Sequence, residues 1–218
     1  MLPADHFISR DSVFVHPTAI VEEGVQIGAG TAVWDNVHIC REARIGIECI
    51  IGEKTYIAPQ VLIGNRVKIN ALVYICSAVT IENGVMVSAG VIFTNDRYPR
   101  ATTPDLTSLR SSEPDEHTLP TLVSEGASIG AGSRIGCGLV IGRFAMIGMG
   151  SVVTKSVPDF ALLWGVPART VGYVCRCGQP LLRFDNQPAP HSATLQCHAC
   201  LRAYDLSVGV LSEQAVKA

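Results

Sequence analysis

The feature that most constrains the fold is a six-residue repeat that begins at Val15. An aliphatic or aromatic residue recurs at every sixth position through Phe93, and a small or β-branched residue follows four places later. Neither a helical period of about 3.6 residues nor a strand period of about two produces this register. Glycine after the aliphatic residue, as at Gly28 and Gly46, suits corners where a side chain would collide or where φ is positive. The pattern is typical of short strands wound into a parallel β-helix, in which each coil stacks on the last.

The repeat is interrupted once and then resumes. Residues 95–120 contain charged residues, Pro, Ser and Thr without regular apolar spacing, so we expect a loop extruded from the helix. The six-residue pattern returns at Val123 and continues to Val153. A loop of this length inside a compact repeat is usually functional. We therefore predict an all-β parallel β-helix over residues 1–172, with the loop as its functional insertion.

Two cysteine pairs follow the repeat, at Cys175 and Cys177 and at Cys197 and Cys200. Paired thiolates on two turns can hold a tetrahedral zinc ion, although the first pair is one residue tighter than the common C-x-x-C. The surrounding segment has too few apolar residues for a metal-free core. The spacing resembles a zinc ribbon over residues 173–210, followed by a tail at 211–218. Disulfide pairing is the alternative, which a reducing compartment disfavours.

The overall composition excludes some partners. A formal net charge of -2 gives no basic footprint for nucleic acid. Charged residues interrupt every apolar segment before it is long enough to span a membrane, and the N-terminus lacks a basic region followed by an apolar run. We expect a cytoplasmic protein that partners neither nucleic acid nor membrane.

The closing motifs of the repeat add a family resemblance. The hexapeptide coils, the extruded loop, Ser151–Lys155 and Gly165–Arg169 together resemble the hexapeptide-repeat acyltransferases. That resemblance implies a left-handed parallel β-helix, a homotrimer, and acetyl-CoA as co-substrate. The segment Phe93–Ala101, with Val33-Trp34 and Val37–Ile39, is similar to the N-acetyltransferases of nucleotide-linked amino sugars, such as those that act on UDP-2-acetamido-3-amino-2,3-dideoxyglucuronate. This branch implies acetylation of an amino group during synthesis of precursors for lipopolysaccharide and other cell-surface polysaccharides.

The branch places its catalytic pair at the loop entrance, where this chain has Asn95 and Asp96. The Asn95 carbonyl oxygen would accept a hydrogen bond from the attacking amine. Asp96 would hold the amine or take its proton. An amine needs mainly to be deprotonated and aimed, and a backbone N–H would stabilise the oxyanion. The alternative for an Asn-Asp pair at a loop start is a simple turn, since both residues favour one.

The resemblance also implies binding residues. For the nucleotide sugar it suggests Trp34, His38, Glu82, Tyr98 and Arg100. For acetyl-CoA it suggests Ala131, Met149, Thr154, Lys155 and Arg169. The two cations suit the anionic phosphates of the cofactor, with solvated surface charge as the alternative.

Other functions on the same fold remain open. An O-acetyltransferase would need a histidine base, and this chain has Tyr98 where that family places histidine before the loop proline. A zinc carbonic anhydrase would need three histidines around one coil, whereas only His16 and His38 lie in the coils and they do not stack on one edge. A non-catalytic β-helix scaffold, with the cysteine-rich segment as a docking module, is the remaining alternative.

Overall fold

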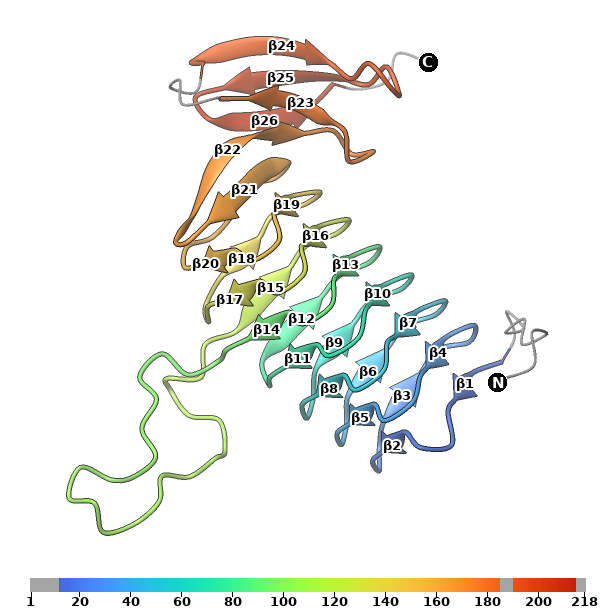
Figure 1. Cartoon of the computed structure of the whole chain (residues 1–218), viewed down its shortest axis with the longest axis vertical. Helices are drawn as coiled ribbons and strands as arrows, with labels where there is room; N and C mark the ends of the chain where they lie inside the picture. Colours follow the sequence, from blue (N-terminus) through green and yellow to red (C-terminus); the bar gives the residue numbers. More distant parts are fainter. Residues whose placement is uncertain (1–11, 185–189, 215–218) are drawn as a thin grey trace.

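The computed structural model describes residues 12–184 and 190–214, so the first eleven residues of the predicted first domain lie outside it. Every regular element in these ranges is a β-strand, and the parallel strands stack as coils of a solenoid (Figure 1). The prediction of an all-β parallel β-helix with an extruded loop is confirmed. Within the described residues, no helix could cross a membrane.

Three sheets form the walls of the prism, and within the coils their neighbouring strands are parallel and come from successive coils. Sheet A contains, in spatial order, β1 Phe14–Val15, β4 Ala32–Val33, β7 Ile50–Ile51, β10 Lys68–Ile69, β13 Met86–Val87, β16 Ser128–Ile129, β19 Met146–Ile147, β21 Ala161–Gly165, β22 Ala168–Val174 and β23 Pro180–Arg183. Sheet B contains β2 Ile20–Val21, β5 His38–Ile39, β8 Tyr56–Ile57, β11 Tyr74–Ile75, β14 Ile92–Phe93, β17 Arg134–Ile135 and β20 Val152–Val153. Sheet C contains β3 Gln26–Ile27, β6 Arg44–Ile45, β9 Leu62–Ile63, β12 Val79–Ile81, β15 Thr121–Val123 and β18 Val140–Ile141.

The core is a column of aliphatic side chains inside the prism. Ile57 pairs with Ile75 in the next coil, and both are fully buried. The small inward position is also filled, since Cys49 is fully buried and its thiol donates to the carbonyl oxygen of Gly64 at 3.1 Å. Because each coil covers the apolar face of its neighbour, stacking supplies the stability that a single coil lacks.

Of the two reasons expected for glycine at the corners, close approach and positive φ, the structure supports the first at Gly28 and Gly46. A Cβ on Gly28 or Gly46 would lie 2.6 Å from a backbone carbon of the next coil, so glycine is needed there for close approach. Their φ angles are not positive, which corrects one of the two reasons expected from the sequence. Left-handed φ angles occur at the third residue after a strand, for example 57° at Lys54 after β7 and 61° at Leu72 after β10. This conformation is unfavourable for L-residues. It recurs because the corner N–H bonds to the preceding coil, as Lys54 does to the Asp35 carbonyl oxygen at 3.0 Å.

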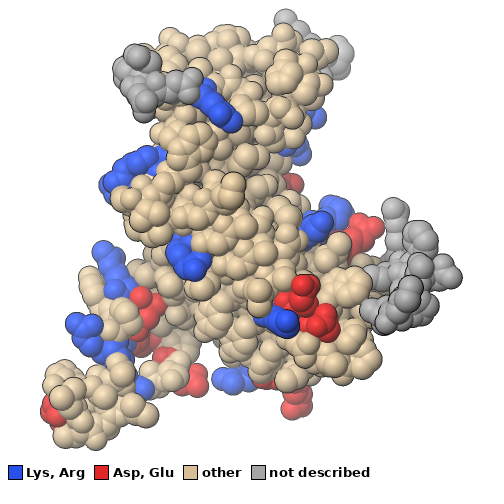
Figure 2. Space-filling view, in the orientation of Figure 1, with Lys and Arg blue, Asp and Glu red and all other residues tan. Residues whose placement is uncertain are grey.

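Two features depart from the regular prism. The loop between β14 and β15 projects away from it and carries both acidic and basic side chains (Figures 1 and 2). Beyond the last coil, β21 pairs parallel with β19, and β22 and β23 then continue sheet A as antiparallel strands. A separate antiparallel tail sheet follows, formed by β24 Ser192–Gln196, β25 Ala203–Ser207 and β26 Val210–Glu213. The Phe160 and Tyr204 rings pack edge-on at 5.5 Å, which joins the tail sheet to the end of the solenoid.

Candidate active site and metal centre

Asn95 lies at the corner between sheets B and C, two residues after β14, where the loop leaves the prism. Ser77 occupies the same corner one coil earlier. The Asn95 side-chain amide Nδ2 donates to Ser77 Oγ at 2.8 Å. The backbone carbonyl oxygen of Asn95 accepts the Leu119 N–H at 2.9 Å across the loop neck. The side chain is half-buried. Within the described part of the chain, this leaves Oδ1 as the free acceptor of a fixed amide.

Asp96 is held by the loop. Its Oδ1 accepts the N–H of Tyr98 at 2.7 Å, and its Oδ2 lies 3.6 Å from Arg110 Nη1. The contact with Tyr98 is the one expected of a turn-forming Asp, the alternative that the sequence leaves open. The carboxylate is therefore oriented, and its role as proton acceptor stays a prediction.

A second carboxylate organises the far side of the loop. Asp115 accepts the N–H of His117 at 2.8 Å and a hydrogen bond from Arg110 Nη2 at 2.7 Å, and these contacts lower the Asp115 pKa below its ordinary value. The His117 ring packs edge-on against Tyr98 with ring centroids 5.5 Å apart. Our sequence reasoning sought a histidine only before Pro99 and so missed His117, although it is the one histidine in the loop sequence.

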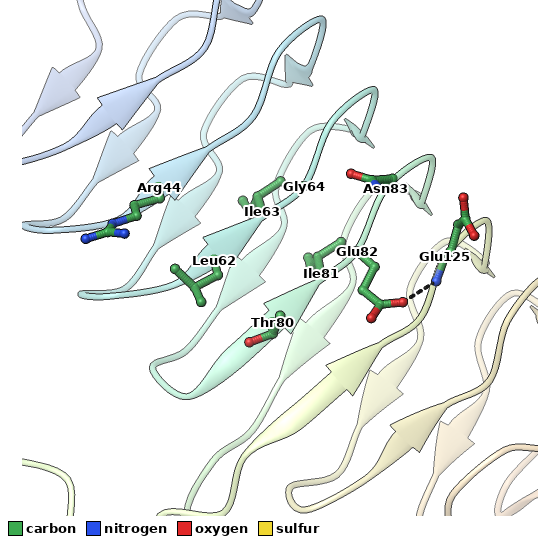
Figure 3. Close-up of a pocket in the computed structure, with 9 residues that line it drawn as sticks. All are labelled: Arg44, Leu62, Ile63, Gly64, Thr80, Ile81, Glu82, Asn83 and Glu125. Atoms are coloured by element: carbon green, nitrogen blue, oxygen red, sulfur yellow. Dashed lines mark hydrogen bonds between the residues drawn. The ribbon is translucent and has the colours of Figure 1, made fainter.

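Three predicted substrate residues lie on other parts of the prism. Trp34 follows β4 at the corner between sheets A and B, His38 is in β5 of sheet B, and Glu82 follows β12 at the corner between sheets C and A. Glu82 Oε2 accepts the Glu125 N–H at 2.9 Å, beside an open groove of about 570 Å³ (Figure 3). A single chain does not bring these three residues together.

The loop supplies the other two predicted substrate residues. Tyr98 is exposed, and Arg100 is exposed with its Nη1 donating to the Pro99 carbonyl oxygen at 2.9 Å. Both lie a few residues beyond Asn95 on the same segment of the loop. Of the predicted substrate residues, these two are therefore the ones that the chain itself holds near Asn95 and Asp96, the predicted catalytic pair.

Four of the five predicted acetyl-CoA residues lie in two groups. Ala131 and Met149 stack one coil apart at the corner between sheets A and B, where the Gly150 N–H donates to the Ala131 carbonyl oxygen at 2.8 Å. Thr154 and Lys155 follow β20 at the corner that also holds Asn95. Two coils separate Lys155 from Asn95, roughly 10 Å at the usual strand spacing.

Arg169 belongs to neither corner. It lies in β22 beyond the last coil, opposite Trp164, and its Nη1 donates to the Ala168 carbonyl oxygen at 2.9 Å. Since the strand pairing does not place it beside Lys155, an interaction of both with one cofactor stays a prediction.

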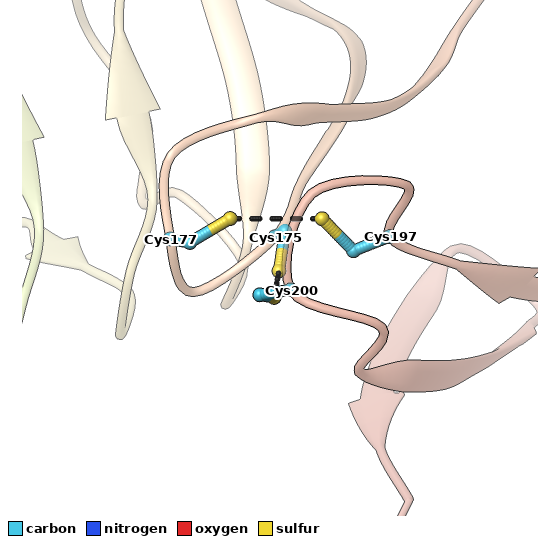
Figure 4. A group of neighbouring side chains, drawn as sticks. All are labelled: Cys175, Cys177, Cys197 and Cys200. Carbon is cyan, nitrogen blue, oxygen red and sulfur yellow. Dashed lines mark hydrogen bonds between the residues drawn. The ribbon is translucent and has the colours of Figure 1, made fainter.

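The four predicted metal ligands converge in the tail. All four Sγ atoms lie within 4.8 Å of one another, with Cys175 and Cys200 3.4 Å apart and Cys177 and Cys197 3.6 Å apart (Figure 4). Thiolates about 2.3 Å from a tetrahedral zinc ion would be separated by about 3.8 Å, so the cluster fits this metal.

Hydrogen bonds favour the thiolate at Cys197, whereas the pKa values of Cys175 and Cys177 are raised, at Cys175 mainly by burial. Burial would raise the pKa of Cys197, but the backbone N–H groups of Cys200 and Ala199 and the neighbouring thiols lower it to about 6. The fully buried phenol of Tyr204 lies 3.1 Å from Cys175 Sγ and accepts the Arg176 N–H at 3.0 Å. The buried Tyr204 phenol thus orients the predicted ligand Cys175, as hydrogen bonds from surrounding residues do in metal sites.

Comparison with known proteins decides the family. No family model matches the chain. It is 48% identical over 205 residues to a dTDP-3-amino-3,6-dideoxy-alpha-D-galactopyranose 3-N-acetyltransferase of Aneurinibacillus thermoaerophilus, an alignment that covers 94% of this chain and 97% of that protein. The chain belongs to the N-acetyltransferases of nucleotide-linked amino sugars. The predictions of an acyltransferase and of this branch are confirmed.

Two other similarities are weaker. The serine acetyltransferase of Escherichia coli (strain K12) is 50% identical over 50 residues, only 23% of this chain and 18% of that protein. The structure of AntD, an N-acyltransferase from Bacillus cereus in complex with dTDP and 3-hydroxybutyryl-CoA, superposes with a TM-score of 0.51 at 21% identity, over 76% of this chain and 81% of AntD. At 21% identity, this likeness shows only that the chain and AntD share a fold.

Proposed function

We propose that this N-acetyltransferase transfers the acetyl group of acetyl-CoA to the 3-amino group of a dTDP-linked 3-amino-3,6-dideoxyhexose, in the cytoplasm. The observation that carries the proposal is the near full-length similarity to the Aneurinibacillus thermoaerophilus enzyme, whose name specifies that sugar. This similarity narrows the proposed substrate class, because the resemblance drawn from the sequence also included UDP-linked sugars. The product would be a nucleotide-linked acetamido sugar, a precursor for lipopolysaccharide or another cell-surface polysaccharide.

Asn95 would aim the nucleophile. Its Oδ1 accepts one N–H of the sugar amine and directs the nitrogen lone pair at the thioester carbonyl carbon. The C–N bond forms, the C–S bond breaks, and the amine proton passes to the departing CoA thiolate or to Asp96. The fixed amide of Asn95 supports this role, because its Nδ2 is already committed to Ser77 at 2.8 Å. For an amine nucleophile, such positioning accounts for most of what the site must supply.

Acetyl-CoA would lie along the corners of the last coils. Backbone groups at Ala131 and Met149 would bond the pantetheine amides, and Met149 is 82% exposed at its corner. Thr154, Lys155 and Arg169 would contact the phosphates and the adenosine end. The position of Lys155 on the same corner as Asn95 supports phosphate binding near the reacting amine. Because Ala131 and Met149 lie on the corner between sheets A and B, their contacts to that cofactor would have to come from a neighbouring copy.

We further propose a homotrimer with its active sites between subunits. Trp34, His38 and Glu82 are separated on the prism, so contacts from them to the Asn95 site would have to come from a neighbouring copy. The projecting loop exposes Leu106 and Leu109 by 78% and 80% respectively, which suits packing against another subunit. Sedimentation showing a fully active monomer would contradict this assembly.

The four clustered cysteines would hold one zinc ion in a ribbon-like module over residues 173–210. Thiolates at Cys175, Cys177, Cys197 and Cys200 fill all four positions of a tetrahedral ion, so no site remains for substrate or water. The metal would therefore be structural. The contact of Cys175 with the fully buried Tyr204 phenol favours a zinc ion that stays bound.

The test is a CoA-release assay with matched sugars. Acetyl-CoA is mixed with dTDP-3-amino-3,6-dideoxygalactose, its 4-amino isomer, the UDP-linked 3-amino sugar, or L-serine. We expect the dTDP-linked 3-amino sugar to react fastest and serine not to react. A His117→Asn variant should keep its activity, because amine acetylation needs no histidine base. If no amino sugar leads to release of CoA, the proposed function is refuted and the non-catalytic scaffold is favoured.

A further inference from the structure

A second group of metal-ligating side chains lies on sheet B, outside the acetyl-transfer site. Residues Ile20 and Val21 of β2 pair in register with His38 and Ile39 of β5. Glu22 therefore lies beside Cys40, one coil apart. His38 and Cys40 are two residues apart in sequence, a spacing that turns both toward the same face of an extended chain. The winding of the coils thus brings a carboxylate, an imidazole and a thiol together.

The donor atoms of these residues converge on one ring nitrogen. His38 Nε2 lies 2.6 Å from Glu22 Oε1 and 3.8 Å from Cys40 Sγ, and the three donors lie within 4.8 Å of one another. In a Cys–His–carboxylate relay, the acid and the nucleophile contact different ring nitrogens. Here both approach Nε2, so the arrangement does not suit a nucleophilic triad. It suits ligands that share one ion.

Surrounding groups hold the donors in place. Glu22 Oε2 accepts the Arg41 N–H at 2.8 Å, which with His38 keeps the pKa of the carboxyl below its ordinary value. Burial raises the pKa of the Cys40 thiol. The Tyr56 ring packs edge-on against His38 at 5.5 Å. Such outer contacts orient metal ligands and set their affinity.

We propose that Glu22, His38 and Cys40 form a second metal site that binds a divalent ion of the zinc or cobalt class. A mixed oxygen, nitrogen and sulfur set suits these ions, whereas magnesium and calcium prefer oxygen ligands alone. The ion would bind Nε2 of His38 with the imidazole proton on Nδ1, take the place of the hydrogen bond between Glu22 and His38, and displace the thiol proton of Cys40 to solvent. Three protein ligands leave one position for water.

Within one chain, the site lies apart from Asn95 and Asp96. His38 and Asn95 are three coils apart along sheet B, roughly 14 Å at the usual strand spacing. A ligand role for His38 differs from the sugar contact that the sequence suggests. The ion would fasten the first coil to the second, where the inward position is poorly buried: Val21 is 39% exposed, whereas Ile39 and Ile75, at the same inward position of later coils, are fully buried.

Cobalt(II) is the probe for this site. The full chain is first loaded with zinc and dialysed until one zinc ion per chain remains, in the four-cysteine cluster, and is then titrated with cobalt(II), while the thiolate-to-cobalt charge-transfer band and the visible d–d bands are followed. We expect the wild-type chain to bind one more cobalt ion than Cys40→Ala, which should lack the charge-transfer band. Glu22→Gln and His38→Gln, which change half-exposed residues, should weaken binding at least tenfold.

A matched control separates this site from other thiols. Cys76 occupies the equivalent position two coils further on and is similarly buried, but no metal-binding group includes it among the described residues. Cys76→Ala should keep the wild-type spectrum. Spectra that are the same for the wild-type chain and Cys40→Ala would place any cobalt in the tail cluster and overturn the proposal. Absence of cobalt absorption in the zinc-loaded wild-type chain would overturn it as well.

Discussion

The hydrogen bond between Ser77 and Asn95 allows a direct test of how the amine is positioned. If Asn95 aims the amine and Ser77 only fixes Asn95, then Ser77 has no effect on catalysis once Asn95 is gone. The perturbations are Ser77→Ala, Asn95→Ala and the double variant. Both side chains are half-buried at one corner of adjacent coils, so each truncation leaves the buried column of the prism intact.

The expected magnitudes follow from what each truncation removes. Ser77→Ala removes one neutral hydrogen bond of 2.8 Å, worth about 0.5–1.5 kcal/mol, so kcat should fall by up to about tenfold. Asn95→Ala removes the group that contacts the reacting amine, and we expect a fall of about a hundredfold, or roughly 2.7 kcal/mol. The double variant should match Asn95→Ala alone, because residues that act through one another are not additive.

The assay is steady-state CoA release with the best amino sugar, with KM for acetyl-CoA measured in parallel. We expect that KM to stay near the wild-type value in all three variants, since the lost contact belongs to the reacting centre. Losses that multiply in the double variant would show that Ser77 acts independently of Asn95. An Asn95→Ala enzyme with wild-type kcat would refute the reasoning, because the residue would then be only part of a turn.

Three further predictions concern the cofactor, the tail and the loop. Lys155→Ala and Arg169→Ala should raise KM for acetyl-CoA with kcat nearly kept, as expected when uniform binding is lost; steady-state kinetics with varied acetyl-CoA measures this. Cys200→Ser should lose about one zinc ion per chain by metal analysis, while acetyl transfer largely survives because the tail lies beyond the proposed site. Asp115 has a folded-state pKa below its ordinary value, owing to the His117 N–H and then Arg110. Its contribution to loop order is therefore complete at neutral pH and is lost as pH falls through that folded pKa. Asp115→Asn should remove it at neutral pH, and limited proteolysis within the loop should then be faster in the variant at pH 7 but equal for both proteins at strongly acidic pH.

The periodic part of the fold was predictable because one rule operates in every coil. Each aliphatic residue of the six-residue series is the last residue of a strand, and those away from the first coil turn inward and are buried, as at Ile39 and Ile147. The strand pairs follow from the same period, since three hexads return the chain to the same wall. Asn95 and Lys155 share a corner for this reason, because the chain resumes on the next wall after the loop.

The contacts that hold the site were harder to predict, because they join residues outside the period or on neighbouring coils. Ser77 is one full turn before Asn95, so the period could have identified it, but its hydroxyl gives no sequence signal of its own. His117 meets Tyr98 only because the loop folds back on itself. The continuation of sheet A through β22 and β23 was also missed, since these antiparallel strands abandon the hexapeptide pattern.

The way the loop is inserted explains how chemistry can be added to such a regular fold. The strands on either side of it keep their partners: Val79 still pairs with Thr121, and Ile92 with Arg134. The Leu119 N–H closes the loop neck by donating to Asn95, so the coil continues as though the insertion were absent. A change of loop length or composition therefore leaves the inward register intact. One extra residue within a coil, by contrast, would move every later aliphatic residue out of its inward position, as a register slip does in any sheet. Substrate choice can thus vary in the loop while the six-residue period, and the stacking that depends on it, is preserved.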